Sequence, residues 1–437
     1  MKAVKFGGTS MSTAESISRV MRIIGSDPER RYVVVSAPGK AVGEEKVTDM
    51  LVAVYKAKPD ERVSEFTAIR NRFDGICKGL GVPCEFLGDD YAEIASKLPV
   101  ADYDYIVSRG EYLCAKLLAR LLDFDFVDAT ELIKFRGKNY DDERTDKVCR
   151  AELGKHKSAV IPGFYGGDEK GEPVAFSRGG SDISGAIVAR AVNAVVYENY
   201  TDVDGFMTCD PRIVPHATTI DVITYKELRE LAYMGANVLH PESIFPVRKA
   251  NIPIHILNTF NDTAVGTKIV PTEDFLNGKY ERAKKMPITA ITGKKNFFSL
   301  YIDKSMMNAE VGFMRRVLSC FEKFDIAIEH IPSGIDSMTV VFSAVDERTC
   351  NALLAAVKDE VKPDNMHLTK DVALIAIVGH GMKARPGTAA RAINRLSNAN
   401  INLRMIDQGA SEINIILGVS DSDFERALRA LNGEFEV

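Results

Sequence analysis

The chain has 437 residues, 46% of them hydrophobic, and its 56 basic and 61 acidic residues leave a formal net charge of −5. This size allows a large buried core and two or three domains. No long basic run is present, which argues against a nucleic-acid partner or an anionic membrane surface. No stretch approaches the roughly 18 uninterrupted apolar residues that a membrane-spanning helix needs, so we expect a cytoplasmic protein.

The first part of the chain alternates apolar strands with amphipathic helices. We expect strands at 3–6, 32–37, 158–161, 194–198 and 253–257, and helices beginning near residues 12, 111, 182 and 224. Capping-box pairs, Ser12 with Glu15 and Thr224 with Glu227, mark the starts of the first and last of these helices. This alternation predicts a doubly wound α/β domain, whose largely parallel sheet is covered by helices on both faces.

An internal repeat follows the charged segment at Lys284 and Lys285. Residues 297–343 align without a gap with residues 372–418, at a constant offset of 75. Each copy reads as strand, helix, strand, strand and a further helix, which is the order of a ferredoxin-like βαββαβ module. We therefore expect one large domain at 1–284, a first module at 285–370 and a second at 371–437, and leave open an exchange of strands between the modules.

Two glycine-bearing loops, each followed by a predicted helix, carry the clearest signs of chemistry. KFGGTS at 5–10 places Gly7 and Gly8 beside Lys5, so backbone amides and an ammonium group can meet an anion. SRGGSD at 177–182 repeats the pattern, and TDVDGFMTCDPR at 201–212 follows a strand, where open α/β sheets place their ligands. A tight turn with an exposed lysine is the simpler alternative for the first loop alone, but two such loops predict a phosphate site.

These three segments, together with VSRGEYL at 107–113, GFYG at 163–166 and GANVLHP at 235–241, resemble the successive motifs of the amino-acid kinase family, specifically its aspartate kinases. The paired C-terminal modules resemble the ACT domains that follow the catalytic domain in those enzymes. The resemblance covers nearly the whole chain. It implies an eight-stranded, largely parallel sheet between helices, and transfer of the γ-phosphoryl group of ATP to the side-chain carboxylate of L-aspartate, in lysine, threonine and methionine biosynthesis.

The implied reaction suits motifs that are rich in glycine, lysine and arginine. The side chain of aspartate has a pKa near 3.9 and is almost fully ionised at neutral pH, so the nucleophile needs no general base. What the site must supply is positive charge and amide dipoles, because a carboxylate attacks a triphosphate and two anions come together. The absence of an evident catalytic histidine from these motifs is consistent with this demand.

The resemblance also implies roles for individual residues. Lys5 would neutralise the transferring phosphoryl group, and Asp182 would orient Lys5. The aspartate site would comprise Thr48, Glu111, Arg178 and Ser181, with Arg178 as a two-pronged carboxylate clamp and Glu111 against the ammonium group. The nucleotide site would comprise Lys5, Gly7, Gly8, Thr9, Ser10, Gly179, Gly180, Thr201, Asp202, Met207, Arg212, Asn237 and Val238. Mg²⁺ would be held by phosphate oxygens and water, so we expect no metal ligand from the protein.

Two departures from the family pattern fall on the nucleotide side: Met207 stands where we expect a tyrosine, and Asn237 where a lysine is frequent. Two other functions also remain open. One is a kinase of the same fold that acts on glutamate, acetylglutamate or a nucleotide, which the zwitterion clamp of Arg178 and Glu111 disfavours. The other is a catalytically inactive amino-acid sensor, against which Lys5, Arg178 and Asp182 weigh.

The resemblance further implies feedback inhibition by an amino acid bound in the first module, with L-lysine expected and L-threonine as the alternative. The offset of 75 pairs Glu329 with Arg404, which would repel a cationic ligand from the second module. A solvated strand residue is the simpler alternative for Glu329. The candidate effector residues are Met307, Glu310, Gly312, Phe313, Met314, Ile328, Glu329 and Ser333. We expect a homodimer or a dimer of dimers through these modules, whose sheet edges a symmetric partner can cover.

Overall fold

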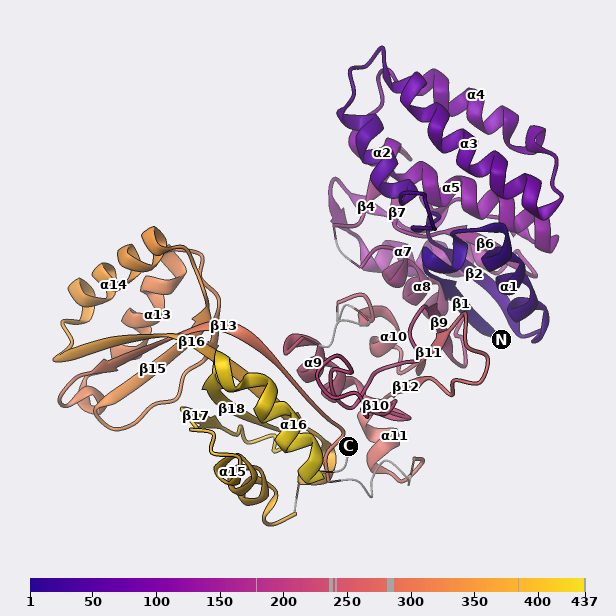
Figure 1. Ribbon diagram of the computed structural model, residues 1–437. Helices are drawn as coiled ribbons and strands as arrows, with labels where there is room; N and C mark the ends of the chain where they lie inside the picture. Colours follow the sequence, from indigo (N-terminus) through magenta and orange to yellow (C-terminus); the bar gives the residue numbers. More distant parts are fainter. Residues whose placement is uncertain (178, 236–238, 240–241, 281–286, 384, 436–437) are drawn as a thin grey trace. The chain divides into compact units, whose positions relative to one another are not determined.

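The computed structural model describes residues 1–177, 179–235, 239, 242–280, 287–383 and 385–435 (Figure 1). It divides into two compact units. The first contains Met1–Phe206, Thr219–Leu228 and Asn237–Tyr280, and the second contains Met207–Thr218, Arg229–Ala236 and Glu281–Val437. Two short segments that the sequence placed in the large domain therefore group with the C-terminal part. Among the described helices, none combines the length and apolar character that crossing a bilayer requires.

The first unit is built on an eight-stranded sheet in the order β10-β12-β11-β9-β1-β2-β6-β3, which is parallel except where β11 meets β12. Its strands are β1 (Lys2–Phe6), β2 (Arg30–Val35), β3 (Asp125–Phe126), β6 (Ala159–Pro162), β9 (Tyr197–Thr201), β10 (Val222–Thr224), β11 (Ile254–Asn258) and β12 (Thr267–Val270). The doubly wound α/β prediction is confirmed. One strand starts later than predicted, because Ala194 closes the preceding helix by donating its amide to the carbonyl of Ala189 (2.9 Å).

Helices cover both faces of this sheet. On one face, Val4 and Phe6 of β1 join a buried cluster with Ile17 and Val20 of α1 and with side chains from α2 to α5. On the other face, α8 packs on β1, β2 and β9. The helices are α1 (Ala14–Gly25), α2 (Val47–Lys56), α3 (Arg62–Leu80), α4 (Gly88–Lys97), α5 (Tyr103–Leu122), α6 (Ala129–Leu132), α7 (Asp142–Leu153), α8 (Gly180–Ala191), α9 (Tyr225–Tyr233), α10 (Phe245–Lys249) and α11 (Thr272–Leu276). Two hairpins complete the unit, β4 (Phe135–Arg136) with β5 (Asn139–Tyr140) and β7 (Tyr165–Gly167) with β8 (Pro173–Ala175).

The capping boxes were predicted with mixed success. Thr224 and Glu227 form the expected reciprocal pair, in which the Glu227 amide donates to Thr224 Oγ1 (3.2 Å) and the Thr224 amide donates to Glu227 Oε2 (2.9 Å). At α1 the prediction was wrong by one position, since Thr13 rather than Ser12 is the N-cap and pairs with Ser16. Ser12 is held in the preceding 3₁₀ turn, where its hydroxyl donates to the carbonyl of Thr9 (2.8 Å).

The second unit is built on a six-stranded antiparallel sheet in the order β14-β15-β13-β16-β18-β17. Its strands are β13 (Ala290–Asp303), β14 (Ile328–His330), β15 (Ser337–Ser343), β16 (Asn365–Val378), β17 (Met405–Asp407) and β18 (Asn414–Ser420), and its helices are α13 (Phe313–Lys323), α14 (Glu347–Val361), α15 (Thr388–Asn398) and α16 (Phe424–Phe435). The long strands β13 and β16 pair along most of their length. Each therefore runs through both copies of the repeat.

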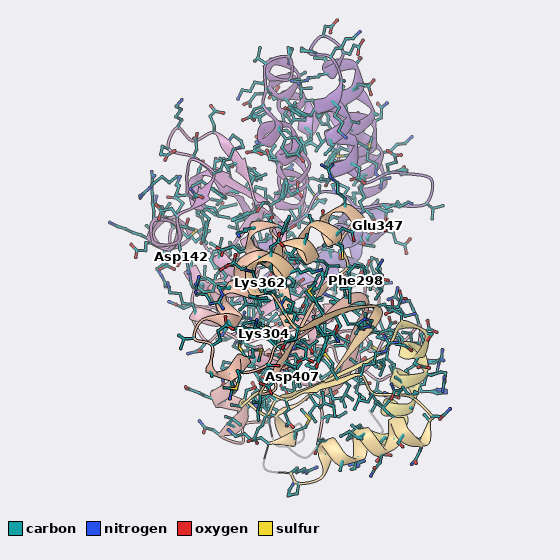
Figure 2. All side chains as sticks on the ribbon, turned by 90° about the vertical axis from the view of Figure 1, so that its left-hand side faces the viewer. Asp142, Phe298, Lys304, Glu347, Lys362 and Asp407 are labelled. Atoms are coloured by element: carbon teal, nitrogen blue, oxygen red, sulfur yellow. The ribbon has the colours of Figure 1, made fainter. Side chains whose placement is uncertain are left out.

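The two copies have separate cores on this shared sheet. One cluster contains Leu300 and Ile302 of β13 with residues of α13, α14 and β15, and the other contains Ile291 of β13 with residues of α15, α16 and β18. Figure 2 labels Phe298, beside the first cluster, and Lys304, whose ammonium group donates to the carbonyl of Lys362 (2.8 Å). Strand pairing therefore joins the copies, while each keeps its own apolar interior.

Candidate active site

A pocket of about 220 Å³ opens where β1 and β9 end in the first unit. The carboxyl ends of parallel strands meet at one edge of a sheet, and open α/β sheets bind their ligands there. The pocket is lined by Lys5, Gly7, Gly8, Thr9, Ser10, Asp182, Asn199, Thr201, Asp202 and Ile256. Residues from the first and third of the predicted segments and Asp182 of the second thus come together.

Lys5 is the cation of this pocket, and its side chain is nearly buried. Its Nζ lies 2.7 Å from Asp182 Oδ1 and 3.4 Å from Asn199 Oδ1, and the amide of Asn199 donates in turn to Asp182 Oδ1 (2.9 Å). Asp182 sits in the first turn of α8, with α8 packed on β1. The three polar groups form a closed network that aims one ammonium group at the pocket.

The first glycine loop is tightly packed. The amide of Gly7 donates to the carbonyl of Tyr200 (3.0 Å), so it is engaged in joining the loop to β9. A Cβ atom on Gly39 would lie 2.6 Å from the carbonyl carbon of Gly8, and the Gly39 amide donates to the Gly8 carbonyl (2.7 Å). Gly39 is therefore needed for the close crossing of two loops, a constraint that the sequence reasoning missed.

Hydroxyl and carboxylate groups form the rest of the pocket wall. Thr9 Oγ1 donates to Asp202 Oδ2 (3.0 Å), which links the KFGGTS loop to the segment after β9. Thr201 Oγ1 donates to the other oxygen of Asp202 (3.3 Å). Ser10 is fully buried and shares a hydrogen bond with Thr259 (2.7 Å between hydroxyl oxygens). Asp202 itself is exposed at the mouth, so a ligand can reach its carboxylate.

The second glycine loop turns directly into α8. Gly179 is the N-cap at φ +75° and Gly180 follows at φ +40°, a left-handed backbone that glycine adopts without steric cost. Ser181 shares a hydrogen bond with Ser36 at the end of β2. The N-terminus of α8 thereby lies at the same edge of the sheet as the first glycine loop, where its amides and dipole favour an anion.

Glu111 and Thr48, predicted for the aspartate site, lie outside the residues that line the pocket. Glu111 on α5 is 4% exposed, and its Oε2 is buried with no hydrogen-bond partner among the described residues. Burial raises the pKa of Glu111 to about 8, although a hydrogen bond from the amide of Ala37 opposes the rise. Thr48 stands in the first turn of α2, which packs on α5. A buried carboxyl oxygen that has no partner within the protein can be satisfied by a water molecule or by a ligand.

The remaining predicted site residues fall into two groups. Arg178 of the aspartate site, and Asn237 and Val238 of the nucleotide site, lie outside the described residues. Met207 and Arg212 belong to the segment that groups with the second unit, where the guanidinium of Arg212 pairs with Asp210 (2.7 Å). Within the described residues, no group of three histidine, cysteine, aspartate or glutamate side chains is arranged to hold a metal ion.

The candidate effector residues gather around the start of α13 and on β14 in the second unit. Gly312 is the N-cap of α13 at φ +82°, and Glu310 before it pairs with Arg316. Met307 and Phe313 are buried in the core of the first copy, while Met314 is exposed. Glu329 and Ile328 lie on β14, the carboxylate of Glu329 accepts from Ser343 Oγ (3.1 Å), and Ser333 bridges to Met338.

Sequence reasoning missed Asn199, Ile256, Ser36 and Thr259. Asn199 had a recoverable signal, because side chains alternate along a strand and Tyr197, Asn199 and Thr201 of β9 must share one face. Its partner could not be read from the chain, since Lys5 and Asn199 are paired by the β1–β9 register across 194 positions.

Comparisons with known proteins agree with this architecture. A model of the amino acid kinase family matches residues 1–258, and a model of the ACT domain matches residues 375–435. Aspartokinase 3 of Bacillus subtilis is 36% identical over 457 aligned positions, which cover 100% of this chain and 98% of that protein. The aspartate kinase of Clostridium acetobutylicum has a solved structure that is 39% identical, with a TM-score of 0.91 and full coverage of both chains.

Two solved structures of Escherichia coli aspartokinase III are also similar, each 25% identical to this chain. One is a complex with aspartate and ADP in the R-state, with a TM-score of 0.74 and full coverage of both chains. The other is a complex with lysine and aspartate in the T-state, with a TM-score of 0.75 and coverage of 100% of this chain and 99% of that one.

Proposed function

The chain belongs to the amino acid kinase family and phosphorylates aspartate with ATP, and from this premise we propose that the pocket around Lys5 is where the γ-phosphoryl group is transferred. The product is 4-phospho-L-aspartate, at the entry to lysine, threonine and methionine biosynthesis. The observation that carries the proposal is the pair of nearly buried Lys5 with half-buried Asp182, whose Nζ and Oδ1 atoms lie 2.7 Å apart at the end of β1 and the start of α8. A positioned ammonium group beside helix-terminal amides stabilises the charge that moves onto the leaving phosphate.

The amino acid occupies the part of the site formed by α2, α5 and the start of α8. Glu111 receives the substrate ammonium group, which supplies the missing partner for its orphaned oxygen. Arg178 clamps a substrate carboxylate, and Thr48 and Ser181 donate hydrogen bonds. Escherichia coli aspartokinase III binds aspartate, which supports aspartate as the amino-acid ligand. A carboxyl oxygen that has no partner in the free protein becomes paired, and its group ionised, only when a substrate ammonium group arrives, which favours aspartate over anionic substrates that lack an amine.

The nucleotide lies against the two glycine loops, with its phosphates towards Lys5, Thr9, Gly179 and Gly180 and with Thr201 and Asp202 near its far side. Escherichia coli aspartokinase III binds ADP, which supports an adenine nucleotide as the ligand. The donor set fits Mg²⁺ that is carried by the phosphates, because Asp182 and Asp202 are the carboxylates among the lining residues and Asp182 is already paired with Lys5. Bound there, the ion would screen phosphate charge, with Asp202 within reach of its water shell.

Hydroxylamine trapping of the acyl phosphate tests the reaction directly. We expect hydroxamate from L-aspartate with ATP and Mg²⁺, and none from L-glutamate or N-acetyl-L-glutamate. A nucleoside monophosphate would give a diphosphate and no acyl phosphate, so for this acceptor ADP release is measured, and we expect none. ADP release should require L-aspartate. Hydroxamate from L-glutamate or N-acetyl-L-glutamate, or ADP release driven by a nucleoside monophosphate, would assign a related kinase activity. Binding of an amino acid without ADP release would assign a sensor.

We also propose that both copies of the repeat are ACT domains, that they join two chains in a homodimer, and that L-lysine binds the first copy as a feedback inhibitor. Lysine bound to the T-state of the Escherichia coli enzyme supports the effector. Exposed apolar residues around the candidate effector segment, namely Met306, Val311, Met314, Ile331 and Ile335, support an interface. L-Threonine is the second candidate. Sedimentation and an inhibition series with the two amino acids test these assignments.

A further inference from the structure

We infer that Asn199 is a positioning residue of the phosphoryl-transfer site, which fixes Lys5 and Asp182 relative to each other through its side-chain amide. The inference rests on the proposed function, since it assigns Lys5 to the transferred phosphoryl group. Asn199 lies outside every predicted motif, yet it is 2% exposed and lines the pocket.

The strand register places Asn199 beside Lys5. The two residues are paired in the parallel β1–β9 ladder, and neighbouring strands lie about 4.8 Å apart, so side chains on the same face are adjacent. The Lys5 ammonium group donates to Asn199 Oδ1 (3.4 Å), and Asn199 Nδ2 donates to Asp182 Oδ1 (2.9 Å). With the Lys5–Asp182 contact at 2.7 Å, these bonds close a triangle.

A carboxamide suits the gap between an ammonium group and a carboxylate because it accepts from one and donates to the other without adding charge. A carboxylate at position 199 would repel Asp182, and an apolar side chain would leave both charged groups with one partner fewer. The neutral amide also leaves the charge of Lys5 available to a phosphate. When a phosphate oxygen draws Lys5 away from Asp182, the amide of Asn199 still satisfies the carboxylate, so Asp182 keeps its place.

A purely structural role, anchoring α8 to the sheet, is already filled by a neighbouring residue. Tyr197 lies two positions earlier on the same face of β9, and its hydroxyl donates to the backbone carbonyl of Asp182 (3.1 Å). Asn199 instead contacts the side chain of Asp182. Tyr197→Phe is therefore a matched control, because it removes a hydrogen bond to the same residue without touching the carboxylate.

The test compares Asn199→Leu, Tyr197→Phe and wild type in the hydroxylamine assay, with thermal melts for each protein. Because direct removal of a preorganised electrostatic group costs about 100-fold to 1,000-fold in kcat, loss of its positioning partner should cost Asn199→Leu about 10-fold to 100-fold. KM for aspartate should change less than kcat. Tyr197→Phe should lower the Tm and keep kcat within about twofold of wild type, since its lost bond is structural.

A pH series with Asn199→Asp separates positioning from packing. The introduced carboxyl faces both Asp182 and the Lys5 ammonium group; it repels Asp182 when ionised and donates an O–H to it when protonated. Because Lys5 is already paired with Asp182 (2.7 Å), a second carboxylate at this pair favours protonation. The kcat of this variant relative to wild type at the same pH should therefore rise as the pH falls from 8 to 6. A ratio that stays constant over this range would show that position 199 acts through packing alone.

A folded Asn199→Leu protein with kcat within twofold of wild type would overturn the inference. If wild type gives no hydroxamate, the proposed function fails, and the crystal structure of Asn199→Leu then decides the inference by itself. Displacement of the Lys5 ammonium group from Asp182, with α8 unmoved, would support it. An unchanged Lys5–Asp182 contact would contradict it.

Discussion

The pocket of the first unit and the repeat of the second unit hold their charged groups in different ways. In the pocket, Lys5, Asp182 and Asn199 satisfy one another in a nearly closed network. In the repeat, the paired positions Glu329 and Arg404 carry opposite charges and have different partners, which for Glu329 include the side chain of Tyr233. Glu329 accepts from Ser343 (3.1 Å), and exposed Arg404 donates to the carbonyl of Asp371 (3.2 Å).

This difference indicates which residues determine each function. Pocket chemistry depends on a few buried atoms that constrain one another, so a single substitution should act on the rate. The copies of the repeat share one sheet and differ at exposed positions, so they can diverge in ligand preference while the scaffold remains intact. Substitutions in the pocket and substitutions in the repeat should therefore differ in how large their effects are. They should also differ in the measured quantity that they change, which is the rate in the pocket and the ligand preference in the repeat.

Lys5→Met should have the largest effect. Methionine is of comparable length but carries no charge, so the transferring phosphoryl group loses its cation, and kcat should fall about 100-fold to 1,000-fold. Hydroxamate formation measures the rate, and circular dichroism establishes that the protein is folded. Near-normal turnover in a folded Lys5→Met protein would remove Lys5 from the reaction.

Glu111→Gln should weaken the interaction of the enzyme with aspartate more than its interaction with ATP. An ion pair to the substrate ammonium group becomes a neutral contact, and losing a charged hydrogen bond of about 1.5–3 kcal/mol lowers kcat/KM for aspartate by roughly 10-fold to 150-fold. KM for ATP serves as the internal control. Equal losses for both substrates would place Glu111 away from the amino-acid site.

Proton release on binding gives a second test of the same carboxyl. Because burial raises the pKa of Glu111 to about 8, the group is mostly protonated in the free protein at pH 7. A bound ammonium group favours the ionised form, so aspartate should release a proton, measurable by calorimetry in buffers of different ionisation enthalpy. Glu111→Gln should abolish this release. Release that persists in the variant would come from another group.

The raised pKa of Glu111 also fixes the sign of its effect on stability. Between its ordinary value of 4.5 and about 8, the folded state binds a proton that the unfolded state has lost, so this group makes the free energy of unfolding fall as the pH rises. The free energy of unfolding, measured by urea melts, should therefore fall less between pH 5 and pH 8 in Glu111→Gln than in wild type. Equal losses would mean that the carboxyl ionises normally.

Glu329→Ala and Arg404→Ala form a matched pair across the two copies. If lysine binds the first copy, Glu329→Ala removes a charged hydrogen bond of about 1.5–3 kcal/mol and should raise the lysine concentration for half inhibition by roughly 10-fold to 150-fold. Arg404→Ala should leave it unchanged. A wild type that is indifferent to millimolar lysine would end the lysine hypothesis, and equal shifts in both variants would end the distinction between the copies.

Local patterns sufficed for five strands of the first sheet and for the repeat, because alternation and 3.6-residue periodicity report burial directly. Four helices of the first unit were predicted, but α5 begins at Tyr103 rather than near residue 111, and helices such as α2, α3 and α4 were missed. Local patterns also failed where a neighbouring turn or a distant strand determines the position of a cap or the partner of a side chain. The 3₁₀ turn at Thr9 moved the cap of α1 from Ser12 to Thr13. In the same way, Lys5 and the glycine loops were found from composition, whereas Asn199 gains its partner from a parallel pairing that no local pattern encodes.

Two aspartate N-caps provide the smallest test, which asks whether the units unfold separately. Asp102 accepts from the amide of Tyr105 (2.9 Å) at the start of α5, and Asp346 accepts from that of Thr349 (3.0 Å) at the start of α14. Each unit has a core of its own, so calorimetry should resolve two transitions. Replacing either cap by alanine should lower only its own unit's Tm, by a few degrees.

Lysine sharpens this test, because a ligand that binds one unit stabilises that unit by mass action. It should raise the transition that Asp346→Ala lowers and leave the other in place. The cap at Asp346 has its own pH signature, since hydrogen bonds from Thr349 hold the pKa of its carboxyl below the ordinary 3.8. Its contribution is present above that value and is lost as the pH falls through the lowered pKa, so the wild-type advantage over Asp346→Ala should vanish in acid. A single transition that both substitutions shift equally would mean that the two units unfold as one.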